Sequence, residues 1–150
     1  MKTKTVRKYI YDGLGFPVEL HDVEMVMIDG EFHPKIDVRK VADSTINSLV
    51  LQQTRLTGNQ IKFIRTYFSM SLREFTRIAN ESHMAIKKWE DYKDKPTNMD
   101  KNVEIMLRLQ IYDHITSRKQ KNKKAMFYDH FSALINIFSH SVSTQHLKTA

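Results

Sequence analysis

Two helix-start patterns, 14 residues apart, constrain the fold of this 150-residue chain more than any other feature. Each pattern places Thr or Ser at the N-cap and Gln or Glu three residues later, with an apolar residue on either side. The capping boxes are Thr57 with Gln60 and Ser71 with Glu74, and the hydrophobic staples are Leu56 with Ile61 and Met70 with Phe75. Because one helix must end before the next is capped, the sequence predicts two short helices, over about 58–68 and 72–79.

A third short helix is predicted after a tight turn. Asn80 fits the left-handed position that ends the second helix, because Asn tolerates positive φ better than other side chains. Ser82 then caps a helix from His83 to about Asp91. Two short helices joined in this way describe a helix-turn-helix, in which the second helix enters the major groove of DNA.

The spacing within this third helix sorts its side chains. Ile86 and Trp89 are three residues apart and both apolar, so they are predicted in the core, with Trp89 a core anchor rather than a base-stacking platform. The helix then turns Met84, Lys87, Lys88 and Asp91 away from the core, with His83 on the flank of its first turn. A Met can contact a thymine methyl, Lys can reach guanine O6/N7 or a phosphate, and His can bond to either.

The N-terminal third is predicted to contain β structure. Asp29-Gly30 separates the apolar run Val23–Ile28 from Glu31-Phe32-His33, which indicates a hairpin with a type I′ turn. The stretch around Gly15–Leu20 suggests another strand or turn. Asp37 is placed to cap a half-buried helix from Val38 to Val50.

The chain after Pro96 is predicted to be helical. Val103, Met106, Leu107, Ile111 and Ile115 form one apolar face. A last amphipathic helix carries the stripe Phe127, Phe131, Leu134, Ile135 and Phe138. We therefore expect a mainly α protein with three parts: a β-hairpin and helix module (1–51), a lambda-repressor-like helix-turn-helix bundle (52–116), and a basic linker with a C-terminal helix (117–150). The final helix is expected to contribute to a homodimer, because alone it would expose its stripe.

Positive charge is concentrated in the middle of the chain. Residues 52–125 carry 16 Lys/Arg and 8 Asp/Glu, whereas the flanking segments are nearly neutral. This asymmetry favours a nucleic-acid footprint. The predicted DNA contacts are Ser71, Arg73, Ser82, His83, Met84, Lys87, Lys88, Lys93 and Lys95. Further phosphate contacts are predicted at Arg118, Lys119, Lys121, Lys123 and Lys124, a run that is equally compatible with a solvated linker.

Residues 55–115 resemble the Cro/C1-type (Xre-like) helix-turn-helix family. The resemblance rests on Ile61, Ile64, Ser71–Phe75, Asn80, Ser82 and Ala85–Glu90, and it includes an Ile-x-x-Trp-Glu ending. It implies a helical bundle that binds an operator as a dimer and represses transcription. Three positions depart from the family pattern: Leu72 replaces a common Gln, Thr76 a common Ala, and Glu81 an apolar residue.

The N-terminal third resembles bacterial antitoxins of the MqsA/YgiT-like group. The matching stretches are Gly13–Val18, Val23–Met27, Asp29–Phe32 and Leu56–Gly58. The resemblance implies a cognate toxin as partner and autoregulation of a toxin–antitoxin operon. The β module of that group often binds zinc through cysteines, and this chain contains none, so no metal or other cofactor is expected.

Other functions are less well supported by the sequence. No nucleotide-binding, hydrolase-elbow or HExxH motif is present, so we do not expect an enzyme. His21 and His33 offer a weak metal site across the sheet. No signal peptide or membrane span is predicted, and the absence of Cys suits a reducing cytoplasm. The alternatives are a stand-alone helix-turn-helix regulator with no toxin partner and a nucleic-acid-binding scaffold. RNA would be a possible ligand of the basic run, but a helix-turn-helix favours DNA, because the major groove of RNA is too narrow for a helix to read.

Overall fold

The structure is a computed structural model that describes residues 2–116, 132 and 135–136. It divides into two compact units, residues 1–46 and 47–150, and each is described by itself. The basic run 118–124 lies outside the described residues, as does most of the predicted C-terminal helix. Of its apolar stripe only Ile135 is described, and its side chain is exposed.

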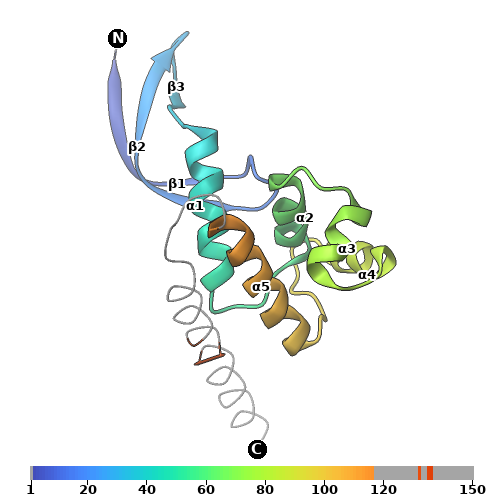
Figure 1. The fold of residues 1–150 in the computed structure, drawn as a ribbon. Helices are drawn as coiled ribbons and strands as arrows, with labels where there is room; N and C mark the ends of the chain where they lie inside the picture. The colour runs from blue at the N-terminus through green and yellow to red at the C-terminus, as the bar shows by residue number, and fades with distance from the viewer. Residues whose placement is uncertain (1, 117–131, 133–134, 137–150) are drawn as a thin grey trace, which may run out of the picture. The chain divides into compact units, whose positions relative to one another are not determined.

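The N-terminal unit contains a three-stranded antiparallel sheet (Figure 1). Its strands are β1 (Thr3–Tyr11), β2 (Val18–Ile28) and β3 (Glu31–Pro34), in that order across the sheet. Asp29 and Gly30 connect β2 to β3 with φ values of 52° and 84°. Positive φ at both central residues defines a type I′ turn, so the predicted hairpin is confirmed.

The mainly α fold class was wrong, because β1 was not predicted and β2 begins earlier than expected. The described residues form a three-stranded sheet followed by five helices, which is an α+β arrangement. Asp22 explains why alternation did not reveal these strands: it lies within β2 with φ 54°. In a regular strand every second side chain turns inward. At this kink the spacing is three residues instead: the inward side chains of β2 are Leu20 and then Val23, and those of β1 are Val6 and then Tyr9.

A helix, α1 (Val38–Leu51), follows the sheet and begins where the sequence predicts. The backbone amide of Lys40 donates a hydrogen bond of 3.2 Å to Oδ1 of Asp37, which confirms Asp37 as the cap. The second unit then contains α2 (Gly58–Tyr67), α3 (Leu72–Ala79), α4 (His83–Glu90) and α5 (Lys101–Thr116). Among the described residues, no helix is long and apolar enough to cross a bilayer.

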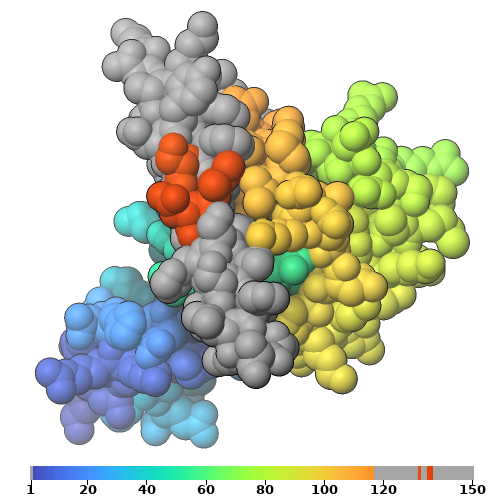
Figure 2. Space-filling view, turned by 90° about the horizontal axis from the view of Figure 1, so that it is seen from below, coloured from blue at the N-terminus to red at the C-terminus, as the bar shows by residue number. Residues whose placement is uncertain are grey.

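The core of the helical unit is drawn from all four of its described helices. Leu56, Ile61, Phe75, Ile86 and Ile111 are completely buried. In the space-filling view the yellow-green segment containing α3 and α4 and the orange segment of α5 form one continuous surface (Figure 2). The hydrophobic pattern thus placed the helices correctly around a common core.

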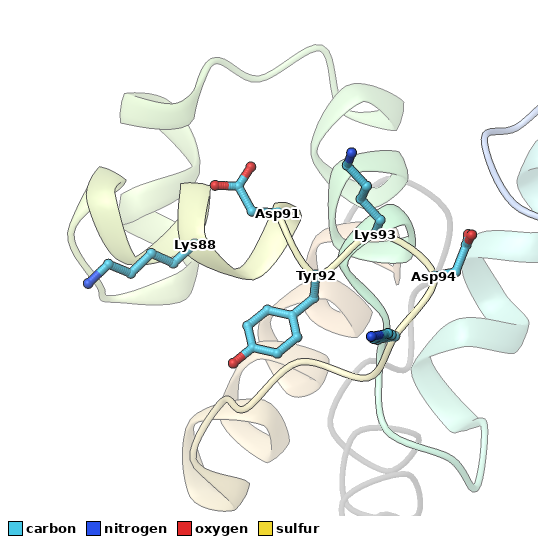
Figure 3. A pocket seen from close by; sticks show the side chains of 6 residues that line it. Lys88, Asp91, Tyr92, Lys93 and Asp94 are labelled. Atoms are coloured by element: carbon cyan, nitrogen blue, oxygen red, sulfur yellow. The ribbon is translucent and has the colours of Figure 1, made fainter.

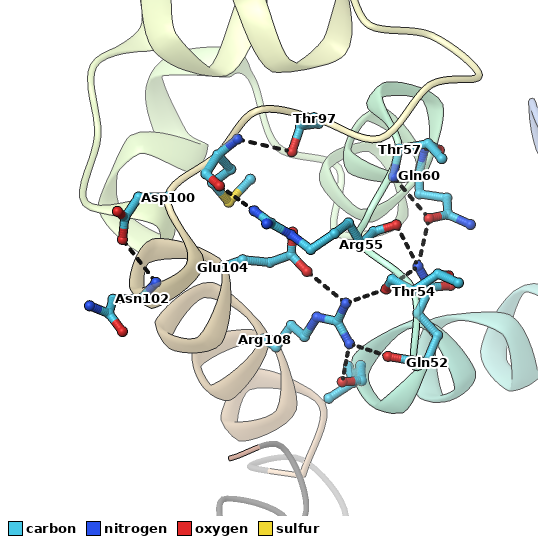
Figure 4. A network of polar contacts seen from close by, with 12 residues as sticks. Gln52, Thr54, Arg55, Thr57, Gln60, Thr97, Asp100, Asn102, Glu104 and Arg108 are labelled. Atoms are coloured by element: carbon cyan, nitrogen blue, oxygen red, sulfur yellow. Dashed lines mark hydrogen bonds and ion pairs between the residues drawn. The ribbon is translucent and has the colours of Figure 1, made fainter. Parts of the chain in front are cut away.

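The predicted apolar face of α5 was only partly correct. Leu107 and Ile111 are buried, but Met106 is 53% exposed. Instead, two charged residues lie inside: Glu104 is 0% exposed and Arg108 is 1% exposed. Nη2 of Arg108 lies 2.7 Å from Oε2 of Glu104, and Oε1 of Glu104 lies 2.8 Å from Nε of Arg55 (Figure 4).

Arg108 also fastens the segment that follows α1. Its guanidinium donates hydrogen bonds to the carbonyl oxygens of Val50, Gln52 and Thr54, at 3.3, 2.6 and 2.7 Å (Figure 4). Burial lowers the pKa of this guanidinium, and the adjacent Glu104 opposes that shift. Because the last carbonyls of a helix lack partners within the helix, Arg108 caps the C-terminal end of α1 from a distant part of the chain.

Candidate nucleic-acid interface

The turn between α3 and α4 forms as the caps predict. Ser71 Oγ accepts from the backbone amide of Glu74 and Ser82 Oγ accepts from that of Ala85, both at 3.1 Å. Asn80 adopts the left-handed conformation, with φ 52° and ψ 43°, and its amide donates to Thr76 O at 2.8 Å. These local bonds end α3 and start α4 within three residues, so they form the predicted helix-turn-helix.

The two predicted capping boxes differ in detail. The box at Thr57 closes in both directions: Gln60 N donates to Thr57 Oγ1 at 3.2 Å, and Thr57 N donates to Gln60 Oε1 at 3.0 Å. In the second, the Ser71 hydroxyl donates to Oε1 of Glu74 at 3.1 Å. Both helices therefore start as predicted, but the Glu74 carboxylate accepts from the Ser71 hydroxyl, whereas Gln60 accepts from the backbone amide of Thr57.

The outward face of α4 carries four side chains with DNA-binding chemistry. Ile86 and Trp89 are buried, as predicted. His83, Met84, Lys87 and Lys88 are exposed, and the Met84 side chain is 59% exposed. Singly exposed apolar side chains are common on protein surfaces, and Met106 is 53% exposed as well, so the relevant feature of α4 is that Met84 lies beside two Lys and a His.

A bidentate ion pair orients α4. Nε and Nη2 of Arg65, on α2, donate to the two carboxylate oxygens of Glu90, at 2.7 and 2.9 Å. Nη1 of Arg65 donates to Met70 O at 3.0 Å, just before α3. The hydrogen bond to Glu90 raises the pKa of Arg65. One guanidinium thus connects three segments of the helix-turn-helix, because its donors form a planar fork that matches a carboxylate.

The loop after α4 is held by the first turn of α2. Gly58 N and Asn59 N donate to the carbonyl oxygens of Lys95 and Lys93, at 3.3 and 2.9 Å. Asn59 Nδ2 also donates to Oδ1 of Asp94 at 2.9 Å. A Cβ atom at position 58 would lie 2.5 Å from Lys93 N and from Trp89 O, so only Gly permits this approach.

This loop and the end of α4 line an open hollow of about 520 Å³ (Figure 3). Its lining residues are Lys88, Asp91, Tyr92, Lys93, Asp94 and Lys95. In the close-up, the Lys88 ammonium points away from the loop and Lys93 extends from the opposite side of the α4 end (Figure 3). Lys88 and Lys93 therefore point in different directions and do not form a single cluster (Figure 3).

The structure brings most of the predicted DNA contacts to α4 and its flanks. His83, Met84, Lys87 and Lys88 share one helix face, and Lys93 and Lys95 are exposed in the next loop. Arg73 is exposed at the start of α3. The Ser71 and Ser82 hydroxyls are used as helix caps, so their side chains serve the fold first.

Sequence reasoning missed Arg77, which is exposed on α3. The sequence contained a signal for it, because Arg77 follows Arg73 by four residues and side chains at that spacing share a helix face.

Thr76 stands where the Cro/C1-type family pattern commonly has Ala. Its hydroxyl is satisfied within α3, where it donates to Arg73 O at 2.5 Å. The predicted contacts at 118–124 lie outside the described residues.

The register of the sheet does not bring His21 and His33 together. In the register of the sheet His33 pairs with Val26, which lies five residues beyond His21 on β2. Five strand residues span on the order of 15 Å, whereas a metal ion binds His nitrogen at about 2 Å. The described part of the chain has no group of three metal-binding side chains.

Comparison with known proteins adds no relative: no protein-family model, curated protein or solved structure matches this chain. The features of the chain that bear on its function are therefore the helix-turn-helix geometry and the side chains that it exposes.

Proposed function

We propose that this chain is a sequence-specific DNA-binding transcriptional repressor. The supporting observation is the group of exposed side chains on α4. This helix is capped by Ser82, follows a turn in which Asn80 is left-handed, and is oriented by the Arg65–Glu90 ion pair. The first turn of such a helix meets base edges in the major groove. Lys88 is the proposed guanine contact, Met84 the thymine-methyl contact, and His83 and Lys87 bond to bases or phosphates.

Phosphate contacts are proposed around this reading helix. Arg73 and Arg77 are exposed on α3, while Lys93 and Lys95 are exposed beyond the end of α4. Cations on both sides of the helix would fix its orientation on the duplex, because phosphate contacts position a protein and base contacts specify the sequence. A homodimer on two half-sites about one helical turn apart is the expected assembly.

The test begins by selecting a preferred duplex from a random library with the full chain. Lys88→Ala is expected to weaken binding to this duplex by about 1–3 kcal/mol and to relax the preference at one base position. Lys62→Ala is the matched control, because Lys62 is an exposed Lys on α2. Failure to enrich any duplex would contradict the proposal; an equal loss on all duplexes would make Lys88 a phosphate contact only.

An antitoxin role is proposed on the resemblance of the N-terminal third alone. The proposed partner is a small toxin protein encoded next to this chain. The neighbouring reading frame should arrest growth when expressed alone, and co-expression of this chain should restore growth. A neighbour without toxicity would leave a regulator that has no toxin partner.

A further inference from the structure

The strand β1 forms an open edge of the sheet in the described part of the chain. The order β1-β2-β3 gives β1 a neighbour on one side only. Met27 N donates to Lys2 O at 3.0 Å, which shows which residues face β2. Because antiparallel pairing alternates, Lys4 and Val6 also turn their backbone groups toward β2, up to the kink opposite Asp22. Over this first half of the strand, the backbone groups of Thr3 and Thr5 turn outward.

This edge has no backbone feature that would stop another strand from pairing, and its protection consists of Lys and Arg side chains, which repel a basic or identical strand. Within its nine residues β1 has no Pro and no Gly, and every residue is exposed or half-buried. Its composition, TKTVRKYIY, is rich in β-branched and aromatic residues. The stretch of this edge before the kink opposite Asp22 is therefore a template for a strand of complementary charge.

Charge is sharply divided along the chain of this unit. Residues 2–8 contain four basic residues and no acidic residue: Lys2, Lys4, Arg7 and Lys8. Residues 9–34 contain six acidic residues and no Lys or Arg: Asp12, Glu19, Asp22, Glu24, Asp29 and Glu31. A second copy of β1 would place like charges across the edge, which is destabilising, whereas an acidic strand would place opposite charges there.

We propose that β1 binds an acidic, extended segment of another protein as a fourth strand of this sheet. The added strand would lie about 4.8 Å from β1 and roughly twice that from β2. The second distance approaches the screening length of about 8–10 Å at physiological salt. The ligand would therefore sense the cations of β1 more strongly than the carboxylates of β2.

The same edge is a poor site for nucleic acid. Lys8 Nζ lies 3.0 Å from Oε1 of Glu19, and Lys4 Nζ lies 4.2 Å from the ring centroid of Phe32, so Arg7 is the cation of β1 on which the attraction of an acidic strand is tested below. A phosphate backbone spread over the face of the hairpin would meet the carboxylates of β2. It would also leave the outward amides and carbonyls of β1 unused, whereas a peptide strand pairs with both.

The experiment uses the full chain, labelled with ¹⁵N, and a nine-residue peptide that alternates Glu and Thr. The amide signals of Thr3 and Thr5, which face outward before the kink, should shift on titration. Two control peptides have the same length: one alternates Lys and Thr, and the other carries a central Pro. Neither control should cause these shifts, because the first repels the edge and the second lacks a central donor.

Two variants of the chain locate the site. Arg7→Glu is expected to weaken binding of the Glu/Thr peptide about tenfold, because it replaces an attractive cross-strand pair by a repulsive one. Thr5→Pro removes an outward N–H and should abolish the β1 shifts. Retained signals of β2 and β3 show that either variant is folded, and Arg7→Glu decides the test if Thr5→Pro unfolds.

Three results would overturn the proposal. The first is equal binding of the Glu/Thr and Lys/Thr peptides. The second is a shift of the β1 amides by duplex DNA that matches the shift by the acidic peptide. The third is self-association through β1, seen as a concentration-dependent mass that Arg7→Glu changes.

Discussion

The helical unit uses its cations in two different ways. The three cations that form ion pairs in its described part are all Arg: Arg55, Arg65 and Arg108. The four exposed cations on α4 and the following loop are all Lys: Lys87, Lys88, Lys93 and Lys95. The guanidinium is a planar fork that loses less on burial, while the ammonium is a strongly hydrated point charge. The internal cations thus hold the fold, and the exposed ones remain available to a ligand.

The concentration of positive charge in residues 52–125 is weaker evidence for DNA binding than the sequence suggested. Residues 52–116 carry eleven Lys/Arg and eight Asp/Glu, so much of the basic excess of the middle segment comes from 118–124. Three of the eleven cations are engaged in ion pairs, and their side chains range from 1% exposed in Arg108 to 34% in Arg55. The case for DNA therefore depends on where the remaining cations lie around α4 more than on their number.

The largest expected effect is at Arg108. Arg108→Ala should lower the free energy of unfolding by about 3–5 kcal/mol, because it leaves Glu104 buried with one cation fewer and removes the donors to three carbonyls. Urea unfolding measures the change. Arg77→Ala, which truncates an exposed Arg, should stay within about 0.5 kcal/mol. Similar losses for both variants would contradict the division between internal and exposed cations.

The second effect is at Arg65. Arg65→Lys keeps the charge but loses the bidentate pair with Glu90 and the bond to Met70, so we expect a loss of about 1.5–3 kcal/mol. A double-mutant cycle with Glu90→Gln should show that the two changes are not additive. Additive losses would mean that the pair contributes little to orienting α4.

The same contrast shows what the sequence could predict. The caps at Asp37, Thr57, Ser71 and Ser82 and the Asp29-Gly30 turn were predicted correctly, because each depends on residues within four positions. The outward set on α4 followed from the spacing of Ile86 and Trp89. The exposed face of the candidate site was therefore accessible to local reasoning.

What escaped prediction depends on contacts between distant parts of the chain. Glu104 and Arg108 interrupt the apolar face of α5, and their burial becomes understandable only with Arg55 and the carbonyls after α1 in place. β1 escaped because its burial pattern shifts by one residue opposite the Asp22 kink, which breaks the alternation that marks a strand.

Substitution of Lys95 is expected to affect stability less than the Arg65 and Arg108 variants do, but to weaken DNA binding. Its side chain is exposed, while its backbone carbonyl accepts from Gly58 N and its backbone amide donates to Tyr92 O. Lys95→Ala should leave the unfolding free energy within about 0.5 kcal/mol. It should weaken binding to all duplexes alike and reduce the slope of log affinity against log salt by about 1. An unchanged slope would place Lys95 outside the footprint.

The basic run beyond α5 can be tested in the same way. Neutralising Lys121, Lys123 and Lys124 together should flatten the salt slope further, if these residues neutralise phosphates. The comparison with Lys95→Ala gives the scale, because that variant removes one exposed cation next to α4. A slope equal to that of the unmodified chain would identify the run as a linker that does not touch DNA.

The smallest expected effect is at the pair Lys8–Glu19 on the sheet. Its atoms lie 3.0 Å apart, close to the distances in the Arg65 pair, but its two side chains are 64% and 46% exposed. Solvent screening leaves such a pair about 0.2–1 kcal/mol. Lys8→Ala should therefore change stability by less than about 1 kcal/mol, and 1 M salt should remove most of the difference. A loss as large as that of Arg65→Lys would mean that distance, rather than burial, sets the strength of ion pairs in this protein.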